Sequence, residues 1–237
     1  MANPHFQFKK FTVHHDKCAM KVGTDGILVG VWTNVSNSLS VLDIGTGSGL
    51  IALMLCQRSR QLNIDAIDID LDAATQATEN IMASPFSNQI NVIHSCLQSY
   101  TDSCLKKYDL IVSNPPFFAD SLKSPIPKRS IARHTETLQI DDLLFYSSRL
   151  LNENGRISLI YPFDYKVQIA QLALSNSLHI TRLTNVHPTP SSKAKRILIE
   201  LSKKECETET NDLTIEKERH RYTEEFTALV RDFYLKL

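Results

Sequence analysis

Short apolar runs alternate with longer stretches of helical composition between about residues 39 and 161. LSVLDIG has the pattern of a strand, and SGLIALMLCQRSR after it has the length and composition of a helix. The alternation continues through LNIDAIDID, LDAATQATENIMA, QINVIHS, KYDLIVSN, QIDDLLFYSSRLL and RISLIYP. This order predicts an α/β domain in which helices cover both faces of a mostly parallel sheet.

Two further strands are expected in LHITRLTNVHP and AKRILIELSKK, after a helix at about residues 164–176. The loop between these strands, PTPSSK, is short, which suits an antiparallel pair at an edge of the sheet. The predicted sheet then has seven strands. Near the end of the chain, TEEFTALVRDFYL carries apolar residues at helical spacing and predicts a C-terminal helix docked on the domain.

These patterns divide the chain into three parts. At residues 1–35 we expect an N-terminal extension that caps the ligand cleft, with hairpin-like alternation in FQFKKFTVHHD. Its KVGTDGILVGVW stretch carries three glycines, which allow tight turns or a close backbone approach, and ends in Trp32, expected as a buried anchor. Residues 36–203 form the predicted core domain. Residues 204–237 are expected as a polar linker, solvated up to about residue 220, followed by the C-terminal helix.

The composition is that of an ordinary soluble globular protein. The chain has 237 residues, of which 42% are hydrophobic and 22% charged, enough for one large domain or two small ones. Its formal net charge is zero. A nucleic-acid partner would therefore have to be bound by local basic patches.

The five cysteines are odd in number and include no C-x-x-C pair. This pattern favours reduced thiols and argues against a disulfide framework or a structural zinc site, so no metal is expected. The N-terminus lacks a signal-peptide pattern, and no apolar run reaches the roughly 20 residues that span a bilayer. We therefore expect no membrane association and a cytoplasmic location.

A glycine-rich turn, VLDIGTGSGL, follows the first predicted core strand and places Asp43, Gly45, Gly47 and Gly49 before a helix. Such a turn lets the backbone approach a ligand at the carboxyl edge of the sheet. The dinucleotide pattern G-x-G-x-x-G fails from Gly45 because Leu50 stands at the third glycine, and the formal match from Gly47 starts inside the helix. The pattern D-x-G-x-G-x-G instead favours S-adenosylmethionine, whose ammonium and sulfonium suit the acid at Asp43.

An acid at the tip of the second core strand is a candidate for binding the ribose of this donor. Asp68 could accept hydrogen bonds from both hydroxyls, and Ile69 would lie against the adenine. Asp65, Asp70 and Asp72 are close in sequence, but the period-two pattern places Asp68 at the strand tip. The alternative is a solvated strand-end carboxylate.

The fourth core strand runs into Asn114, Pro115, Pro116 and Phe117, which we call the lip. Proline cannot donate to a sheet ladder, so the chain leaves the sheet here along a stiff path. The lip displays an amide and an aromatic ring at the ligand edge. A simple strand-breaking turn is the alternative interpretation, but the position of the lip after a fourth strand that itself follows DIGTGSG makes the functional motif more specific.

Several motifs together resemble a known family. DIGTGSG, AIDID and SNPPF look like the Rossmann-like class I S-adenosylmethionine-dependent methyltransferases that act on amino groups. FKKFTVHHDKCAMKVGTDGILVG, IARHTETLQIDDLL and the final DFYL narrow the resemblance to the bacterial tRNA1(Val) N6-methyladenosine methyltransferases. The resemblance implies methylation of the N6 amine of adenine at tRNA position 37, just 3′ of the anticodon, with the anticodon arm of a valine tRNA as partner.

The chemistry of this reaction gives the lip a role. The Asn114 side-chain oxygen and the Pro115 carbonyl could accept the two N–H bonds of the adenine amine and favour its nucleophilic, pyramidal form. Pro115 and Pro116 would fix these acceptors in advance. Phe117 could stack on the base. We therefore predict that all four lip residues are catalytic.

Two further cofactor contacts are expected, the first of them from the resemblance. Many relatives carry an Asp after the third strand, where this sequence has Cys96, so adenine recognition would use backbone groups of Cys96 and Leu97. Thr24 could approach the carboxylate of the donor. A turn hydroxyl without such a role is the alternative for Thr24.

Contacts with RNA are expected from basic segments. The stretch SLKSPIPKRSIARHT follows the lip and contains no acid, so its four cations could meet phosphates around a flipped base: Lys123, Lys128, Arg129 and Arg133. Lys9 and Lys10 belong to a second cluster. The KAKR stretch at 193–196 is interpreted as a solvated strand edge.

The same motifs are compatible with other functions. One is methylation of another planar amine, such as a protein glutamine or guanine N2 of ribosomal RNA. Relatives of that kind usually carry a separate N-terminal recognition domain, for which about 35 residues leave no room. Another is a non-catalytic RNA-binding protein on the same fold. The intact lip and Asp43 argue against it.

Overall fold

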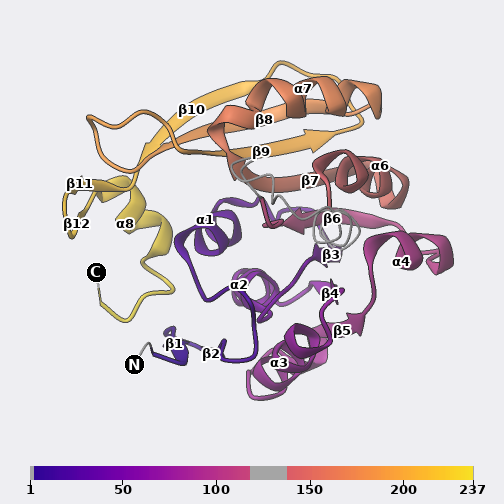
Figure 1. The fold of residues 1–237 in the computed structure, drawn as a ribbon, viewed down its shortest axis with the longest axis horizontal. Helices are drawn as coiled ribbons and strands as arrows, with labels where there is room; N and C mark the ends of the chain where they lie inside the picture. The colour runs from indigo at the N-terminus through magenta and orange to yellow at the C-terminus, as the bar shows by residue number, and fades with distance from the viewer. Residues whose placement is uncertain (1–2, 118–137, 237) are drawn as a thin grey trace, which may run out of the picture.

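The structure is a computed structural model that describes residues 3–117 and 138–236. A central sheet lies between two layers of helices, and the two ends of the chain lie near each other beside one of these layers (Figure 1). This arrangement confirms the predicted α/β fold with helices on both faces.

The strands of the central sheet are β3 (Ser40–Ile44), β4 (Asn63–Asp68), β5 (Ile90–His94), β6 (Tyr108–Ser113), β7 (Leu151–Pro162), β8 (His179–His187), β9 (Arg196–Ser202) and β10 (Glu209–Thr214). Across the described residues their order is β10-β8-β9-β7-β6-β3-β4-β5. Only β9 runs antiparallel to its neighbours, β7 and β8. The sheet is therefore mostly parallel, as predicted, but it has eight strands in this part of the chain rather than seven.

The additional strand, β10, comes from the segment that we expected to be a solvated loop. It pairs in parallel with β8, from Glu209 opposite Arg182 to Thr214 opposite His187. Of its six residues only Leu213 is buried, so the apolar alternation that marks a strand in sequence is missing. The predicted antiparallel pair, β8 and β9, is confirmed. However, β10 covers β8, and the pair does not form the edge of the sheet.

The helices are α1 (Thr24–Trp32), α2 (Leu50–Arg58), α3 (Leu71–Met82), α4 (Leu97–Ser103), α6 (Ile140–Leu150), α7 (Lys166–Ser175) and α8 (Glu224–Val230), with short 3₁₀ turns η1 (Ser87–Gln89) and η2 (Phe163–Tyr165). One apolar core takes residues from α1, α2, α3 and α8, and a second takes them from α4, α6 and α7. Strand residues alternate between the two cores: Leu110 and Val112 belong to the first, Ile111 to the second. This burial on both faces is what continuous apolar strands require.

Helix α1 shows what the N-terminal glycines do. A Cβ on Gly26 would lie 3.1 Å from Leu50, and a Cβ on Gly30 would lie 2.8 Å from the Met54 sulfur, so the glycines let α1 pack closely on α2. The predicted close backbone approach is confirmed, although we did not expect a helix here. Trp32 is buried, as expected, and its indole donates a hydrogen bond of 2.9 Å to Thr184 Oγ1.

The N-terminal and C-terminal segments pack on each other. Strands β1 (His5–Gln7) and β2 (Thr12–His14) form the predicted hairpin, and the residue after β1, Phe8, makes an isolated bridge to Tyr234. Helix α8 is docked as predicted, with Phe226 buried. A second small hairpin, β11 (Glu216–Glu218) and β12 (Arg221–Tyr222), precedes it.

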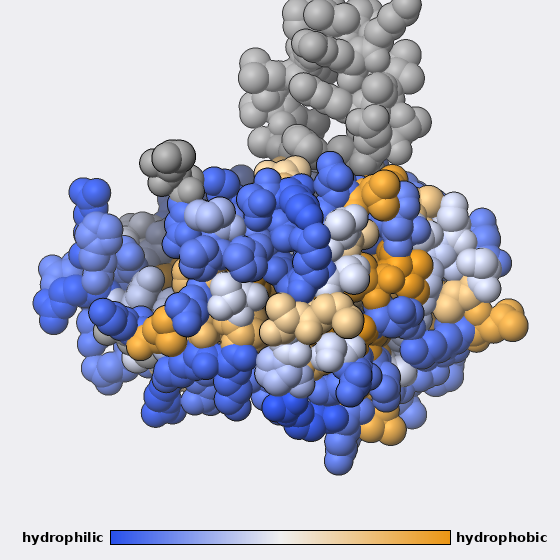
Figure 2. Space-filling view, turned by 90° about the horizontal axis from the view of Figure 1, so that it is seen from below, coloured by the Kyte–Doolittle hydropathy of each residue, from blue (hydrophilic) through white to orange (hydrophobic). Residues whose placement is uncertain are grey.

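The surface of the described residues is mostly polar on the face seen from below, where apolar side chains form small separate groups (Figure 2). Of the helices in the described ranges, none combines the length and apolarity needed to cross a membrane.

Candidate active site

A cavity opens at the carboxyl ends of β3, β4 and β6, which is where open α/β sheets bind ligands. Its volume is about 220 Å³, more than ten times the roughly 10–15 Å³ that one water molecule needs. Among the described residues it is lined by Cys18, Ala19, Met20, Ile44, Gly45, Gly47, Ile67, Asp68, Ile69, Asp70, Ala73, Ser95, Cys96, Leu97, Gln98, Ser113, Asn114, Pro115, Pro116 and Leu138.

The glycine-rich turn forms one side of this cavity. Gly45 and Gly47 line it in the left-handed backbone conformation, with φ of 69° and 55°, which favours glycine. A Cβ on either residue would meet nothing within 4 Å, so the main chain here faces open space. Gly49 has a different role: it begins α2, and a Cβ there would lie 3.5 Å from Ala77.

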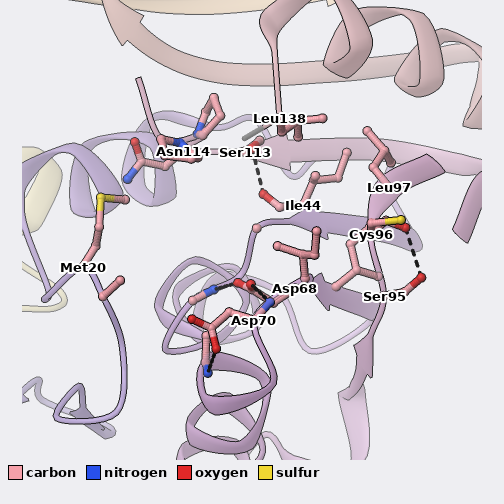
Figure 3. A pocket seen from close by; sticks show the side chains of 18 of the residues that line it. Met20, Ile44, Asp68, Asp70, Ser95, Cys96, Leu97, Ser113, Asn114 and Leu138 are labelled. Atoms are coloured by element: carbon pink, nitrogen blue, oxygen red, sulfur yellow. Dashed lines mark hydrogen bonds between the residues drawn. The ribbon is translucent and has the colours of Figure 1, made fainter. Parts of the chain in front are cut away.

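Asp68 connects the glycine-rich turn with the end of β4. Its Oδ2 accepts a hydrogen bond of 2.7 Å from the Gly47 N–H, and its Oδ1 accepts one of 2.9 Å from the Asp70 N–H (Figure 3). Burial raises the pKa of the Asp68 carboxyl. The structure thus places this predicted ribose-binding acid on the cavity wall and already in contact with the main chain.

Asp43 lies behind the turn rather than on the described lining of the cavity. It is fully buried, and its Oδ2 accepts a hydrogen bond of 2.7 Å from Thr46 Oγ1. Its Oδ1 has no hydrogen-bond partner within the described part of the chain. Burial raises the pKa of this carboxyl to about 7. The structure gives Asp43 a clear role in holding the turn, and its action on the charge of a ligand stays a prediction.

The opposite wall is largely apolar. Leu97 lies there beside Cys96, which is the N-cap of α4 (Figure 3), and Ile69 also lines the cavity. Hydrogen bonds with Ser99 lower the pKa of the Cys96 thiol. The structure therefore brings all three predicted adenine-contacting residues to the cavity lining.

The lip forms the rim above β6. Ser113, the last residue of that strand, donates a hydrogen bond of 2.7 Å to the Ile44 carbonyl and so joins β6 to β3 (Figure 3). Asn114, Pro115 and Pro116 line the cavity, and Asn114 Oδ1 is buried without a partner among the described residues. Buried polar atoms normally have a hydrogen-bond partner. This acceptor is therefore available to a ligand.

Phe117 lies at the end of the lip but not on the described cavity lining. Its ring centre is 5.8 Å from that of Tyr161 and 4.6 Å from the guanidinium carbon of Arg196. Arg196 also forms an ion pair with Asp25. The interpretation of the KAKR stretch as a solvated strand edge is therefore wrong for Arg196.

Three other predicted site residues, Thr24, Lys9 and Lys10, do not line the cavity. Thr24 begins α1 and is exposed. Lys9 donates from Nζ to the Arg231 carbonyl at 2.6 Å, and Lys10 is exposed near it. The remaining basic candidates lie outside the described residues: Lys123, Lys128, Arg129 and Arg133.

Sequence reasoning missed several lining residues. Ile44, Ile67 and Ser113 end or nearly end predicted strands, so the topology alone could have placed them at the cavity. Cys18 and Met20 come from the N-terminal segment before α1, and no sequence signal marked them. Burial raises the pKa of the Cys18 thiol to about 11.

The lining suits S-adenosylmethionine as a ligand. The open backbone at Gly45 and Gly47 offers main-chain groups, Asp68 offers a carboxylate, and Ile69 with Leu97 offers an apolar surface for an adenine ring. No group of three or more His, Cys, Asp or Glu that could hold a metal ion occurs among the residues the structure describes.

Comparison with known proteins defines the class. The family model described as methyltransferase small domain matches residues 20–161. A predicted O-methyltransferase from Agrobacterium tumefaciens has a similar structure, with a TM-score of 0.67 and 17% identity over 88% of this chain and 96% of that one. An O-methyltransferase from neocarzinostatin biosynthesis, solved with S-adenosylmethionine, is also similar in structure. Its TM-score is 0.52 and its sequence identity 13%, over 75% of this chain and 53% of that one. The fold is therefore the Rossmann-like class I methyltransferase fold.

Relatives with higher sequence identity show which methyltransferase family the chain belongs to. A protein of Parabacteroides distasonis is 55% identical over 238 residues, and one of Trichodesmium erythraeum is 48% identical over 238 residues, each covering all of both chains. Both are named tRNA1(Val) (adenine(37)-N6)-methyltransferase. This chain belongs to that family, as its motifs indicated.

Proposed function

We propose that this protein is an enzyme that transfers a methyl group from S-adenosylmethionine to the N6 amine of adenine 37 in tRNA1(Val), giving N6-methyladenosine. The observation that carries this proposal is Asn114 Oδ1, a buried acceptor without a partner among the described residues, on the rim of the cavity. Membership of the family supports the choice of RNA and of position.

The methyl donor would be held by residues on three sides of the cavity. Main-chain groups at Gly45 and Gly47 would hold its amino-acid part, and Asp68 would accept from the ribose hydroxyls. Ile69 and Leu97 would enclose the adenine. When bound, S-adenosylmethionine supplies an electrophilic methyl group on a positively charged sulfur.

The lip would prepare the nucleophile. An adenine amine is a poor nucleophile because its lone pair is delocalised into the ring. Acceptance of its two N–H bonds by Asn114 Oδ1 and the Pro115 carbonyl favours the pyramidal nitrogen that develops during attack. Because proline fixes φ, Pro115 and Pro116 hold these acceptors in place before the substrate arrives.

The N-terminal extension would act as a cap over the cavity. Cys18 and Met20 contribute to its lining, and main-chain N–H of Lys17 donates a hydrogen bond of 3.0 Å to Gln76 on α3. These contacts support the proposed capping role of the extension at 1–35. The cap would shield the donor from solvent while the base enters from the lip side.

The RNA partner would be the anticodon arm of the valine tRNA, which presents position 37 in a loop. Adenine in a loop is removed from the stack at lower cost than adenine in a duplex. We place the enzyme in the cytoplasm because its proposed substrate is found there.

The experiment that tests this function is methyl transfer from labelled S-adenosylmethionine to tRNA isolated from cells that lack the modification, with nucleoside analysis of the product. We expect N6-methyladenosine, confined to the valine tRNA. Label in guanosine, or label only in protein when cell lysate is supplied, would overturn the proposal in favour of another planar amine. Absence of transfer to any substrate despite donor binding would overturn it in favour of a binding protein.

A further inference from the structure

Arg196 lies between the lip and the first helix. Its guanidinium carbon is 4.6 Å from the centre of the Phe117 ring, which is the distance of a cation–π contact. Its Nε donates a hydrogen bond of 2.9 Å to Asp25 Oδ2, in the first turn of α1. One guanidinium at the start of β9 therefore contacts both the lip and Asp25, which lies 171 positions before Arg196 in sequence.

This guanidinium is restrained on several sides. Besides the bond to Asp25, its Nη1 donates to the Lys195 carbonyl at 3.0 Å. The side chains of Arg196 and Asp25 are 30% and 26% exposed, whereas those of the surface pair Lys217 and Glu224 are 52% and 94% exposed. Partial burial reduces screening by solvent, so this ion pair holds a defined geometry better than a surface pair does.

The Phe117 ring is held from a second direction by Tyr161. Their ring centres are 5.8 Å apart at an interplanar angle of 60°, and Tyr161 is buried in the second core. Tyr161 thus supplies a fixed support, and Arg196 supplies the only charged group seen to contact this ring among the described residues. The orientation of the ring therefore depends on where Asp25 holds the guanidinium.

We propose that Arg196 is a positioning residue for methyl transfer: anchored by Asp25, it sets the orientation of the Phe117 ring on which the target adenine stacks. This inference rests on the proposed function. A small rotation of the ring would move the adenine amine away from Asn114, and a misplacement of about 1 Å can lower a rate about 100-fold. The guanidinium is needed because its fixed fork can lie over the ring and donate from Nε to Asp25 at the same time, whereas an ammonium is a compact point charge.

A direct phosphate contact is the competing role for Arg196, and charge-retaining variants separate the two. Arg196→Lys keeps the positive charge but loses the guanidinium that joins the Phe117 ring to Asp25, and Arg196→Gln loses both the charge and the guanidinium. Asp25→Asn keeps the guanidinium but weakens its anchor. A phosphate contact requires only the positive charge, whereas positioning of Phe117 requires the guanidinium and its hydrogen bond to Asp25.

The experiment measures the single-turnover rate, the KM for tRNA and the dissociation constant of S-adenosylmethionine for each variant, with thermal unfolding as a check of folding. We expect Arg196→Lys and Arg196→Gln to lower the rate by about 10- to 100-fold, with KM and donor affinity within about twofold. Asp25→Asn lowers the rate at least about 5-fold, and Asp25→Asn combined with Arg196→Lys is no slower than Arg196→Lys alone. Arg221→Lys, at a surface pair with Glu218, is the matched control and keeps the wild-type rate.

Two results would overturn the inference. One is a wild-type rate for Arg196→Lys together with a raised KM and a flatter salt dependence for Arg196→Gln, which would make Arg196 a phosphate contact. The other is an unchanged rate for Asp25→Asn. Failure of the wild-type protein itself to methylate tRNA would instead overturn the proposed function, so the two failures are distinguishable.

Discussion

The main-chain N–H of Gly47 donates a hydrogen bond of 2.7 Å to the carboxylate of Asp68, which lies 21 residues further along the chain. The other carboxylate oxygen accepts from the Asp70 N–H at 2.9 Å. One side chain thus fixes the glycine-rich turn relative to the tip of β4. Since both segments line the cavity, the shape of the donor site depends on this carboxylate.

Asp68→Ala should weaken donor binding. The substitution removes the acceptor that holds Gly47 and the acceptor proposed for the ribose. Hydrogen bonds to a charged group contribute about 1.5–3 kcal/mol, so we expect the dissociation constant of S-adenosylmethionine to rise by about 10- to 100-fold. Titration calorimetry measures it directly. Asp102→Ala, an exposed position on α4, is the control, and equal affinity in the two variants would contradict this role of Asp68.

Asp43 should make folding stability depend on pH. Burial raises the pKa of its carboxyl to about 7, whereas an unfolded Asp has a pKa of about 3.9. Between these values the folded state binds more protons than the unfolded state. The contribution of Asp43 to the free energy of unfolding therefore falls as pH rises from about 4 to about 7, with a slope that approaches about 1.4 kcal/mol per pH unit.

The check is urea unfolding of the wild type and Asp43→Asn across this range. The advantage of the wild type over the variant should shrink as pH rises. Asp109→Asn serves as a control because the pKa of Asp109 is shifted in the opposite direction. Burial raises the pKa of the Asp109 carboxyl, but hydrogen bonds from the N–H groups of Ser40 and Leu39 outweigh burial and lower it. Its contribution is present at neutral pH and disappears as pH falls below the ordinary Asp value. A difference for Asp43→Asn that does not change with pH would refute the raised pKa.

Two glycines should respond differently to the same added methyl group. A Cβ on Gly155 would lie 2.8 Å from the main-chain oxygen of Tyr108, which cannot move without disturbing β6. Gly155→Ala should therefore cost about 1–3 kcal/mol. A Cβ on Gly30 would lie 2.8 Å from the flexible end of Met54, and a helical Gly→Ala change gains about 1 kcal/mol. Gly30→Ala should change the free energy of unfolding by less than Gly155→Ala in urea titrations, and equal losses would contradict this.

The strands that carry the site could be predicted because their sequences are almost continuously apolar. The runs around Leu42, Ile67 and Val112 became β3, β4 and β6, all buried in the sheet. Since parallel strands bring their carboxyl ends to one edge, residues after these runs could be assigned to one cavity from sequence alone. Asp68 and Asn114 lie there in the structure.

Elements that depend on distant partners could not be predicted in this way. Strand β10 is polar except for Leu213, and it exists because β8 offers a free edge for pairing. The glycines of α1 lower its helical propensity, and the helix is stabilised by close packing on α2. Tertiary contacts override local propensity in both cases.

The same limit applies within the site. The Asp43 carboxylate follows the expected motif, but the fold turns it toward Thr46 and away from the cavity lining that the structure describes. Arg196 was expected at a solvated edge as part of the basic KAKR stretch at 193–196. Its contact with Asp25 depends on the packing of α1 beside β9, which sequence spacing does not encode.

The central claim is that Asn114 acts on the amine and the rest of the cavity binds the donor. The most direct test measures donor affinity and single-turnover methylation of tRNA for Asn114→Ala. Asn185→Ala is a matched control, since its Oδ1 is also buried without a partner in the described ranges and it lies in β8, off the cavity lining. We predict that Asn114→Ala binds S-adenosylmethionine within about twofold of wild type and methylates about 100- to 1,000-fold more slowly, while Asn185→Ala keeps the wild-type rate. Equal losses of binding and rate in Asn114→Ala, or an undiminished rate, would contradict the account.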